Sequence, residues 1–477
     1  MKRSLLVPMI VILAGFFKAQ AAPLWPWQNA SMGEGAPAWA TTDIAAGQIW
    51  YVDINAPESA ETGSHDQPFH RIAAALKVAR PGDEIWLEPG VYHEQVRIRK
   101  PNITLRSSVL HQAKIEVPFN EKKIQQAIRI DFTAKGTRVI GLDISGGYYY
   151  AVSLHTKWKG GPHSGVSQVL LSQNLLHGSG RDLLKINPYV WQVLIERNQF
   201  YRSGQRDNSN AEAIDAVNAS ELWIQDNLIK GIATSGIYVK GGSHEVLIQR
   251  NLIRNVGLAG ILAGFDTSPQ FFNMTDNPNM YEARRVRIIN NIVDGSQGAG
   301  IGAYSAEQVV VAHNTVLNSA IRYHAPIYFG LSFQDRELDA KRPPSKDISV
   351  YNNIFSSLRR DGTVLEVRYL EDDTLGGLSS LQGWPKANNN RYFSAFGPAS
   401  FTDMRPHAKQ RSSNLSEWMK WCACEADTQL IEVTLSYPNY MPQGADFQFT
   451  SKAESLAVDF YQNKRVSTTY VGAVIPN

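Results

Sequence analysis

The stretch LIQRNLI, residues 247–253, repeats with small changes the stretch WIQDNLI, residues 223–229. In both, apolar residues lead to a polar residue, an asparagine and two more apolar residues. The pattern recurs in LLSQNLL, LIERNQF, IINNIV, VAHNTV and VYNNIF, and its asparagines are Asn174, Asn198, Asn227, Asn251, Asn291, Asn314 and Asn353. Such self-similarity indicates a stack of similar structural units.

The spacing of these asparagines predicts the kind of unit. Successive steps are 24, 29, 24, 40, 23 and 39 residues, which is a base step of 23 or 24 with insertions. A coil of three short strands and three turns has this length, and its turns tolerate insertions. Helical periodicity is nearly absent from residue 85 to 360, whereas Val, Ile and Gly-Gly turns are frequent. We therefore expect an all-β solenoid with three parallel sheets.

The recurrent asparagine has an expected role in such a coil. Asparagine tolerates a left-handed backbone better than any other residue except glycine. Its amide can also hydrogen-bond to the same asparagine one coil above. We predict that these residues occupy left-handed corners and form a ladder, while alternate apolar neighbours fill the column.

A helix is expected at the amino-terminal end of this column. The segment FHRIAAALKVA, residues 69–79, places apolar residues along one side, and the following RPGD ends it. The first coil of a solenoid would otherwise leave apolar interior and unpaired strand edges in water. The helix would act as a cap.

A longer passage carries a resemblance to a known group of proteins. IWYVDINAPESAETGSHDQPFHRIAAALKVARPGDEIWLEPGVYHEQVRI, residues 49–98, resembles the amino-terminal unit of bacterial right-handed parallel β-helix proteins of the pectate-lyase-like superfamily. The resemblance implies a right-handed parallel β-helix with an amino-terminal capping helix and an irregular carboxyl-terminal cap. It implies little about activity, because the superfamily includes lyases, hydrolases, epimerases and non-catalytic adhesins.

The chain ends are expected to differ from the solenoid. Lys2 and Arg3 precede a run of 13 residues, 5–17, followed by Ala-Gln-Ala, which is typical of a secretory signal. This run is too short to span a bilayer, which takes roughly 20 apolar residues. We predict a signal peptide at 1–22, a linker at 23–48, the β-helix at 49–360, a loop-rich cap at 361–477, and a secreted or periplasmic protein with no membrane span.

The net charge and the two cysteines limit which ligands and cross-links the protein can have. Removing the leader takes Lys2, Arg3 and Lys18, so 47 basic residues become 44 against 44 acidic ones. A net charge near zero gives no general attraction for nucleic acid, and an acidic ligand must be held locally. Cys422 and Cys424 exclude a disulfide framework but leave open two thiols, one local bridge or a metal site. We expect a monomer.

Charged residues recur at comparable places in successive coils. Lys240 lies in the otherwise apolar IYVKGG, and His155, Lys185, Asp215 and Asp266 lie similarly in VSLHTK, LLKIN, AIDAVN and LAGFD. The aligned coils place these side chains outward on one sheet, about 4.8 Å apart along the stack. They form either a solvated ion-pair ladder, worth roughly 0–1 kcal/mol per pair, or a groove for an extended polysaccharide.

The second interpretation predicts a reaction. β-Elimination on a uronate polymer needs a base and a cation that stabilises the developing enolate. We assign Lys240 as the base and Lys185 as a carboxylate-binding catalytic group, because a nearby cation favours a neutral lysine. Asp215 would orient these groups or, with Asn218 and Asp207, supply oxygen ligands to Ca²⁺.

Three more residues are expected to contact substrate. Arg284, in YEARRVRI, could clamp a carboxylate. His155 and Asp266 would flank the substrate along the charged row. The arrangement resembles the family-nine pectate lyases and, less closely, the family-six alginate and chondroitin lyases, in which a lysine base acts beside calcium. The dense aspartate cluster of the former is reduced here to Asp215 and Asp207.

Three functions follow from the sequence. The first is an exported polysaccharide lyase that acts on an acidic, uronate-containing polymer. The second is a glycoside hydrolase, which needs two carboxyl groups about 5–9.5 Å apart; Asp215 with Asp182 or Asp266 could serve. The third is a non-catalytic β-helix that binds an anionic polysaccharide along the row.

Overall fold

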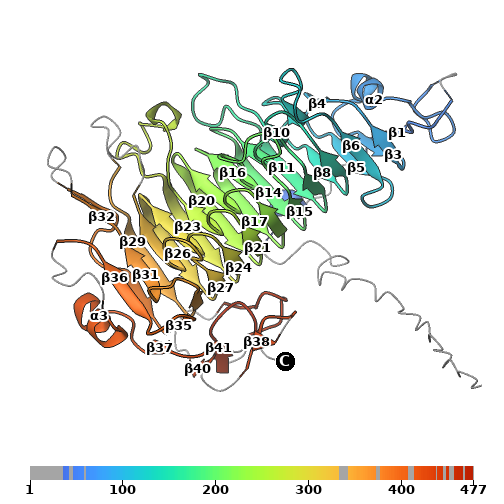
Figure 1. Ribbon diagram of the computed structural model, residues 1–477. Helices are drawn as coiled ribbons and strands as arrows, with labels where there is room; N and C mark the ends of the chain where they lie inside the picture. The colour runs from blue at the N-terminus through green and yellow to red at the C-terminus, as the bar shows by residue number, and fades with distance from the viewer. Residues whose placement is uncertain are drawn as a thin grey trace, which may run out of the picture.

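Three long parallel sheets form the body of the protein (Figure 1). The computed structural model describes residues 36–41, 47–57, 61–331, 342–371, 377–406, 413–433, 435–436, 438–443, 447–450, 456–465 and 468–475. Each coil passes through the first, the third and then the second sheet, as named below. The predicted all-β solenoid is confirmed. The predicted signal peptide, residues 1–22, lies outside the described residues.

The strands of the three sheets pair in parallel throughout. The first sheet contains β1 (Ile49–Val52), β2 (Glu84–Leu87), β5 (Thr104–Ser107), β8 (Arg138–Ile140), β11 (Ser167–Ser172), β14 (Trp191–Glu196), β17 (Ser220–Gln225), β20 (Ser243–Gln249), β23 (Ala283–Ile289), β26 (Ala306–Ala312), β29 (Lys346–Tyr351) and β34 (Lys386–Asn388). The second contains β4 (Val96–Ile98), β7 (Gln126–Ile130), β10 (Tyr150–Leu154), β13 (Leu184–Ile186), β16 (Ile214–Val217), β19 (Ile237–Lys240), β22 (Ile261–Ala263), β25 (Ile301–Tyr304), β28 (Ile327–Gly330), β31 (Thr363–Val367) and β36 (Ser400–Asp403). The third contains β3 (Gly90–Tyr92), β6 (Ala113–Glu116), β9 (Asp143–Ser145), β12 (Leu175–His177), β15 (Gln199–Tyr201), β18 (Leu228–Ile232), β21 (Leu252–Val256), β24 (Ile292–Ser296), β27 (Thr315–Ser319), β30 (Ile354–Ser357), β35 (Arg391–Ser394) and β37 (Gln429–Leu430).

The remaining elements are short. The helices are α1 (Ala38–Thr41), α2 (Ile72–Val78), α3 (Leu415–Cys422) and the 3-10 turn η1 (Pro269–Phe271). Three antiparallel pairs lie outside the three sheets: β32 (Tyr369–Leu370) with β33 (Leu378–Ser379), between β31 and β34, and, after the last coils, β38 (Leu435–Ser436) with β39 (Met441–Pro442) and β40 (Gln448–Thr450) with β41 (Thr468–Tyr470). Parallel coils continue past residue 360 through β34, β35 and β36, and the division of the chain into domains stays a prediction.

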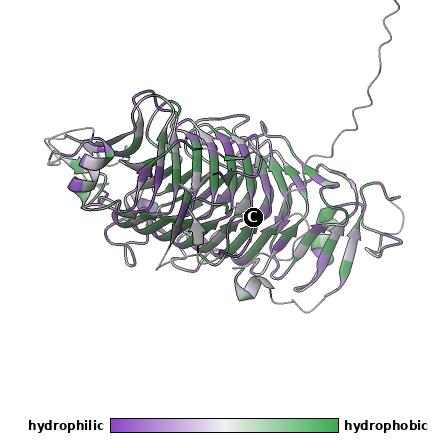
Figure 2. Cartoon of the chain, turned by 90° about the horizontal axis from the view of Figure 1, so that it is seen from below, coloured by the Kyte–Doolittle hydropathy of each residue, from purple (hydrophilic) through white to green (hydrophobic). Residues whose placement is uncertain are grey.

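One apolar core fills the column from Val52 to Cys422. Side chains alternate between the interior and the outer face because the strand repeat is two residues, and Figure 2 shows hydrophobic and hydrophilic residues alternating along the stacked strands. Ile237 and Val239, for example, are fully buried on either side of Tyr238 in β19. A polar side chain at an outward position therefore does not enter the apolar core.

The predicted asparagine ladder runs through the interior corner between the first and third sheets. The amide nitrogen of Asn227 donates to Oδ1 of Asn251 (2.9 Å), and that of Asn251 donates to Oδ1 of Asn291 (2.9 Å). The same bond links every repeat asparagine from Asn174 to Asn353 and continues to Asn390. Each amide also donates to a backbone carbonyl, such as Ile224 O for Asn251 (2.8 Å). The ladder therefore satisfies the polar groups of a buried corner.

The prediction that the ladder asparagines themselves are left-handed is wrong. The left-handed residue is the one before each asparagine, with φ between 49° and 59°. These residues are Gln173, Arg197, Asp226, Arg250, Asn290, His313, Asn352 and Asn389. The turn is made one position earlier, which leaves the asparagine free to point its amide inward along the ladder.

Replacing Asn251 with alanine is expected to lower the free energy of unfolding by about 2–4 kcal/mol. The change leaves two buried donors of Asn227, its backbone N–H and its amide, without their acceptor, at roughly 1–3 kcal/mol per buried unsatisfied group. Chemical denaturation measures the loss. The exposed Asn120→Ala variant should stay within about 0.5 kcal/mol of the parent; equal losses in both variants would contradict a structural role for the ladder.

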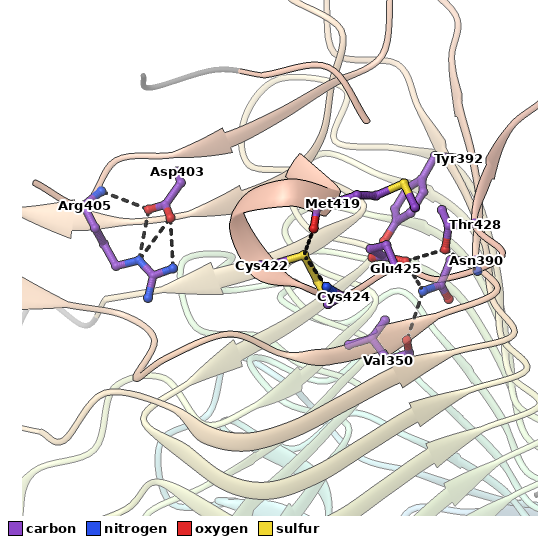
Figure 3. The surroundings of a disulfide bond; sticks show 10 residues. All are labelled: Val350, Asn390, Tyr392, Asp403, Arg405, Met419, Cys422, Cys424, Glu425 and Thr428. Atoms are coloured by element: carbon purple, nitrogen blue, oxygen red, sulfur yellow. Dashed lines mark hydrogen bonds and ion pairs between the residues drawn. A yellow bond between two sulfur atoms is a disulfide. The ribbon is translucent and has the colours of Figure 1, made fainter. Parts of the chain in front are cut away.

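Both ends of the column are covered. Helix α2 contacts β1, β2 and β4 and buries Ile72 and Ala75, as predicted for the amino-terminal cap. At the other end α3 follows the last coils, and Cys422 and Cys424 form a disulfide bond at its end (Figure 3). Beside it the ladder finishes, because Asn390 donates its amide to the buried carboxylate of Glu425 (2.9 Å).

The terminal segments also cover two of the three outer faces. Ala36, Trp39 and Ala40 pack against the first sheet, where Trp39 meets Trp223 edge to face. The segment that carries β38 to β41 lies below β24 and β27 in Figure 1. Its residues Tyr440, Phe447, Phe460, Val471, Ala473 and Val474 pack against the outer face of the third sheet. These contacts leave the second sheet to carry the charged row on its outer face.

Candidate functional site

The charged row lies on the outer face of the second sheet. Lys185 in β13 pairs in register with Asp215 in β16, as the aligned coils predict. The next position of the row is Tyr238, whereas Lys240 lies two residues further along β19 and pairs with Val217. Because two residues return a side chain to the same face, the Lys240 ammonium still reaches Asp215, with Nζ 3.7 Å from Oδ1. The three predicted catalytic residues are therefore together.

The two lysines of this site are held differently. Lys185 Nζ donates a short hydrogen bond to Asp215 Oδ2, and although burial opposes its charge, Asp215 and Asp182 raise the pKa of Lys185. Lys240 lies at ion-pair distance only, 3.7 Å, with its Nζ 4.0 Å from the centre of the Tyr238 ring. A hydrogen bond to nitrogen is about 2.7–3.2 Å long. Lys185 is thus a fixed cation, and Lys240 is less tightly bound.

Three buried carboxyl groups lie beneath the lysines. Oxygen atoms of Asp182, Glu212 and Asp215 all lie within 4.8 Å of one another. Burial, followed by the negative charges of Glu212 and Asp215, raises the pKa of Asp182 well above its usual value. Burial also disfavours the charge of Asp215, but Lys185 and Lys240 hold its pKa below the usual value. The site therefore places a carboxyl group whose surroundings favour the protonated form beside one whose surroundings favour the ionised form.

Sequence reasoning missed Glu212. Asp182 precedes Lys185 by three residues, and Glu212 precedes Asp215 by the same number. Since Lys185 and Asp215 are register partners, the equal offset brings the two acids side by side, and Glu212 N–H donates to Asp182 Oδ1 (3.2 Å). This equal offset of three residues is visible in the sequence and could have identified Glu212.

The structure does not gather the predicted calcium ligands. Asn218 donates its amide to Phe271 O (2.6 Å). Asp207 accepts from Ser209 and lies 3.5 Å from Arg181. The group that could hold a cation among the described residues is instead Asp182, Glu212 and Asp215. Carboxylate oxygens are suitable ligands for Ca²⁺, although Lys185 already neutralises one of them.

The predicted substrate-binding residues are also dispersed. Arg284 lies in β23 of the first sheet and donates a short hydrogen bond to Asp276. Asp266 follows β22, and its backbone N–H donates to the hydroxyl of Tyr238 (2.9 Å). His155 follows β10, its Nε2 lies 2.9 Å from Ser153 Oγ, and it borders the amino-terminal part of the row.

A buried carboxylate explains the Gly-Gly turn that follows Lys240. Glu282, fully buried, accepts from Gly241 N–H (2.8 Å) and from the Thr267 hydroxyl (2.7 Å). Arg342 Nε donates to the same carboxylate (3.1 Å). Gly241 has a φ of +64°, and a side chain there would lie 2.9 Å from Thr267. This network fixes the end of β19 and the position of Lys240.

Two half-buried histidines should make the stability of the protein depend on pH in the acid range. Burial lowers the pKa of both His155 and His324 to about 4, and neighbouring arginines add to the effect. In the unfolded chain a histidine takes up its proton near 6.5, so these groups cost stability as the pH falls from about 6.5 to 4. In His324→Phe, which can keep the stacking on Tyr328, the unfolding free energy should fall less steeply over this range. Equal slopes, measured by denaturation across pH, would contradict this account.

The fold and the row together define a class, the right-handed parallel β-helix proteins. The family described as a right handed beta helix region matches residues 126–278, which include the whole Lys185–Asp215–Lys240 site. No curated protein sequence matches the chain. Among the described residues, every helix is too short or too polar to cross a membrane.

Solved structures extend the likeness over most of the chain. The chain is similar to the mannuronan C-5 epimerase AlgE4 A-module of Azotobacter vinelandii (11% identity, 82% of this chain and 100% of that chain, TM-score 0.52). It is also similar to a family 28 exopolygalacturonase of Yersinia enterocolitica (12%, 83% and 77%, 0.51). A third is the GH136 lacto-N-biosidase of Eubacterium ramulus (14%, 80% and 68%, 0.50). At these identities the likeness is one of fold.

Proposed function

We propose that this protein is a carbohydrate-active enzyme that binds an acidic polysaccharide along the second sheet and cleaves it by β-elimination. The observation that carries the proposal is the difference between the two lysines around Asp215. Lys185 is a hydrogen-bonded cation suited to a uronate carboxylate, while Lys240 is held at 3.7 Å and is available as a base. The three similar structures are a mannuronan epimerase, an exopolygalacturonase and a lacto-N-biosidase, and these carbohydrate-acting names support the substrate class.

The proposed reaction uses these groups in one sequence. Lys185 binds the uronate carboxylate and stabilises the negative charge that develops next to it. Lys240, after its ammonium group has released a proton to solvent, removes the proton from the carbon beside the carboxylate. The bond to the leaving oxygen breaks, a carbon–carbon double bond forms, and the leaving oxygen takes a proton from water. Asp215 keeps both lysines in place.

Calcium is a proposed ligand rather than a step of this reaction. A Ca²⁺ ion would bind among the three carboxyl groups of Asp182, Glu212 and Asp215. Because the pKa of Asp182 is raised, this group would have to lose its proton first. Binding should therefore strengthen as the pH rises. A calcium titration followed by thermal unfolding tests this; a stabilisation that is independent of pH would argue against these ligands.

The activity is tested by incubating the purified protein with a panel of uronate polymers, with and without chelator. β-Elimination yields an unsaturated product that absorbs ultraviolet light. Appearance of this absorbance together with new reducing ends supports the proposal. New reducing ends without absorbance would identify a hydrolase, and binding without either would identify a non-catalytic polysaccharide-binding protein.

Hydrolysis is the second candidate because the pKa of Asp182 is raised while that of the neighbouring Asp215 is lowered. One group could protonate the leaving oxygen and the other could act as nucleophile or base. One oxygen of each carboxyl group lies within 4.8 Å of the other, which is closer to the separation of about 5–5.5 Å in retaining hydrolases than to the 6.5–9.5 Å of inverting ones. We also infer an oxidising compartment, secreted or periplasmic, from the Cys422–Cys424 disulfide.

A further inference from the structure

The outward row of the second sheet continues from Lys185 toward the amino-terminal cap. Ser153 pairs with Lys185, Arg129 pairs with Ser153, and Arg97 pairs with Arg129. At about 4.8 Å per strand, Arg129 lies roughly 10 Å from Lys185 along the axis and Arg97 roughly 14 Å. A polymer that lies over Lys185 and follows the sheet would pass these arginines.

The charges at this end of the row do not balance. Arg97, Arg99 and Arg129 all direct Nε at the carboxylate of Asp131, whose side chain is 4% exposed. Burial would raise the pKa of Asp131, but its bonds to Arg97 and Arg129 hold it below the usual value. We call these three arginines the arginine cluster. One guanidinium would neutralise Asp131, so the cluster carries an excess of two positive charges.

The free sides of the guanidinium groups face solvent. Arg97 and Arg129 each use Nε for Asp131, and no described residue accepts a hydrogen bond from their terminal nitrogens. The side chains of Arg97 and Arg99 are 44% and 64% exposed. A guanidinium presents paired N–H groups that match a carboxylate. The cluster therefore keeps donors for an external anion.

A pocket of about 380 Å³ adjoins the cluster between α2 and β4. Arg97 and Arg99 line it together with Lys77, Glu94 and Gln95. The one carboxylate among these, Glu94, already accepts from the backbone N–H groups of Ile72 and Ala73 at the start of α2. An acidic sugar residue placed here would meet cationic groups at the mouth and little competing negative charge.

We propose that the arginine cluster is a second carboxylate-binding subsite, which holds a uronate residue of the same polymer that lies over Lys185. The inference rests on the proposed function for the nature of the ligand, but it requires binding rather than cleavage. A polymer held at both places would run parallel to the helix axis, from Lys185 toward the amino-terminal cap. It also predicts that long oligomers bind more tightly than short ones.

The test compares oligomer lengths in a variant that keeps Asp131 neutralised. Arg97→Gln combined with Arg99→Gln removes two charges and leaves Arg129 bonded to Asp131. Calorimetric titration with a uronate hexasaccharide should show a dissociation constant at least about tenfold higher than for the parent, because the variant loses charged hydrogen bonds to a sugar carboxylate. Disaccharide binding, if confined to Lys185, should not change.

The control is Arg287→Gln, an exposed arginine of the first sheet, which should bind both oligomers like the parent. Hexasaccharide affinity that is unchanged in the double variant, while the parent binds and cleaves uronates, would overturn this inference alone. A parent protein that binds no uronate oligomer would overturn the proposed function and the subsite with it. Binding confined to sulfated oligosaccharides and lost in the double variant would overturn the assignment to a carboxylate.

Discussion

Replacing Lys240 with glutamine is expected to lower the rate of eliminative cleavage by about 10²–10⁴-fold, the usual contribution of a positioned general base. Glutamine cannot accept the proton from carbon, while the Lys185–Asp215 pair remains in place. Affinity for the polymer should change much less than the turnover number, because Lys185 still binds the carboxylate. Initial rates of ultraviolet absorbance increase, measured over a range of polymer concentrations, separate the two effects.

The chain offers a matched control in Lys346→Gln. Lys346 also pairs with a carboxylate, Glu307 (2.8 Å), and its Nζ also lies over a tyrosine ring, that of Tyr281, but it belongs to the first sheet. This variant should cleave like the parent. Full activity in Lys240→Gln, or an equal loss in both variants with the fold retained, would show that Lys240 is not the base.

Replacing Asp215 with asparagine is expected to lower the free energy of unfolding by about 3–5 kcal/mol, because removing one member of a buried ion pair leaves the other charge uncompensated. Here two cations would be left, since Lys185 and Lys240 are only 14% and 12% exposed and both face Asp215. Denaturant unfolding measures the loss. The fold should survive, because the ladder and the apolar core do not involve this side chain.

A second variant distinguishes charge from packing. Adding Lys185→Met to Asp215→Asn removes one of the two stranded cations, so the double variant should regain part of the lost stability. Residues in contact are expected to couple by about 0.5–3 kcal/mol. Strictly additive losses would contradict the ion-pair account of this site.

The fold could be predicted because its stabilising contacts repeat in the sequence. Each ladder asparagine must supply the same amide to its neighbour, so the residue type is retained while the coil length varies. The left-handed position before it carries no such signature, since Gln173, Arg197 and Asp226 serve equally well. The ladder continues to Asn390, 37 residues after Asn353. The sequence pattern does not reveal this residue, because Asn390 lies in the run NNN with no apolar stretch before it.

The site was predicted in part for the same reason. Lys185 and Asp215 occupy equivalent places in strands of regular length, and they proved to be register partners. In β19 the register partner of Asp215 is Tyr238 rather than Lys240, which lies two residues further along the strand. Arg284 lies in the strand that leads into the ladder residue Asn291, and every such strand belongs to the first sheet, so the ladder itself places Arg284 away from the row. The roles assigned to all these residues stay predictions.

The most direct test of the central claim, that an acidic polysaccharide lies along the second sheet over Lys185, is a structure of the Lys240→Gln variant with a bound uronate oligomer. The account predicts one sugar carboxylate at Lys185 Nζ and the chain running along the row toward Arg129. An oligomer bound elsewhere, such as in the pocket of about 440 Å³ lined by Arg202, Gln205 and Asn255, would contradict it.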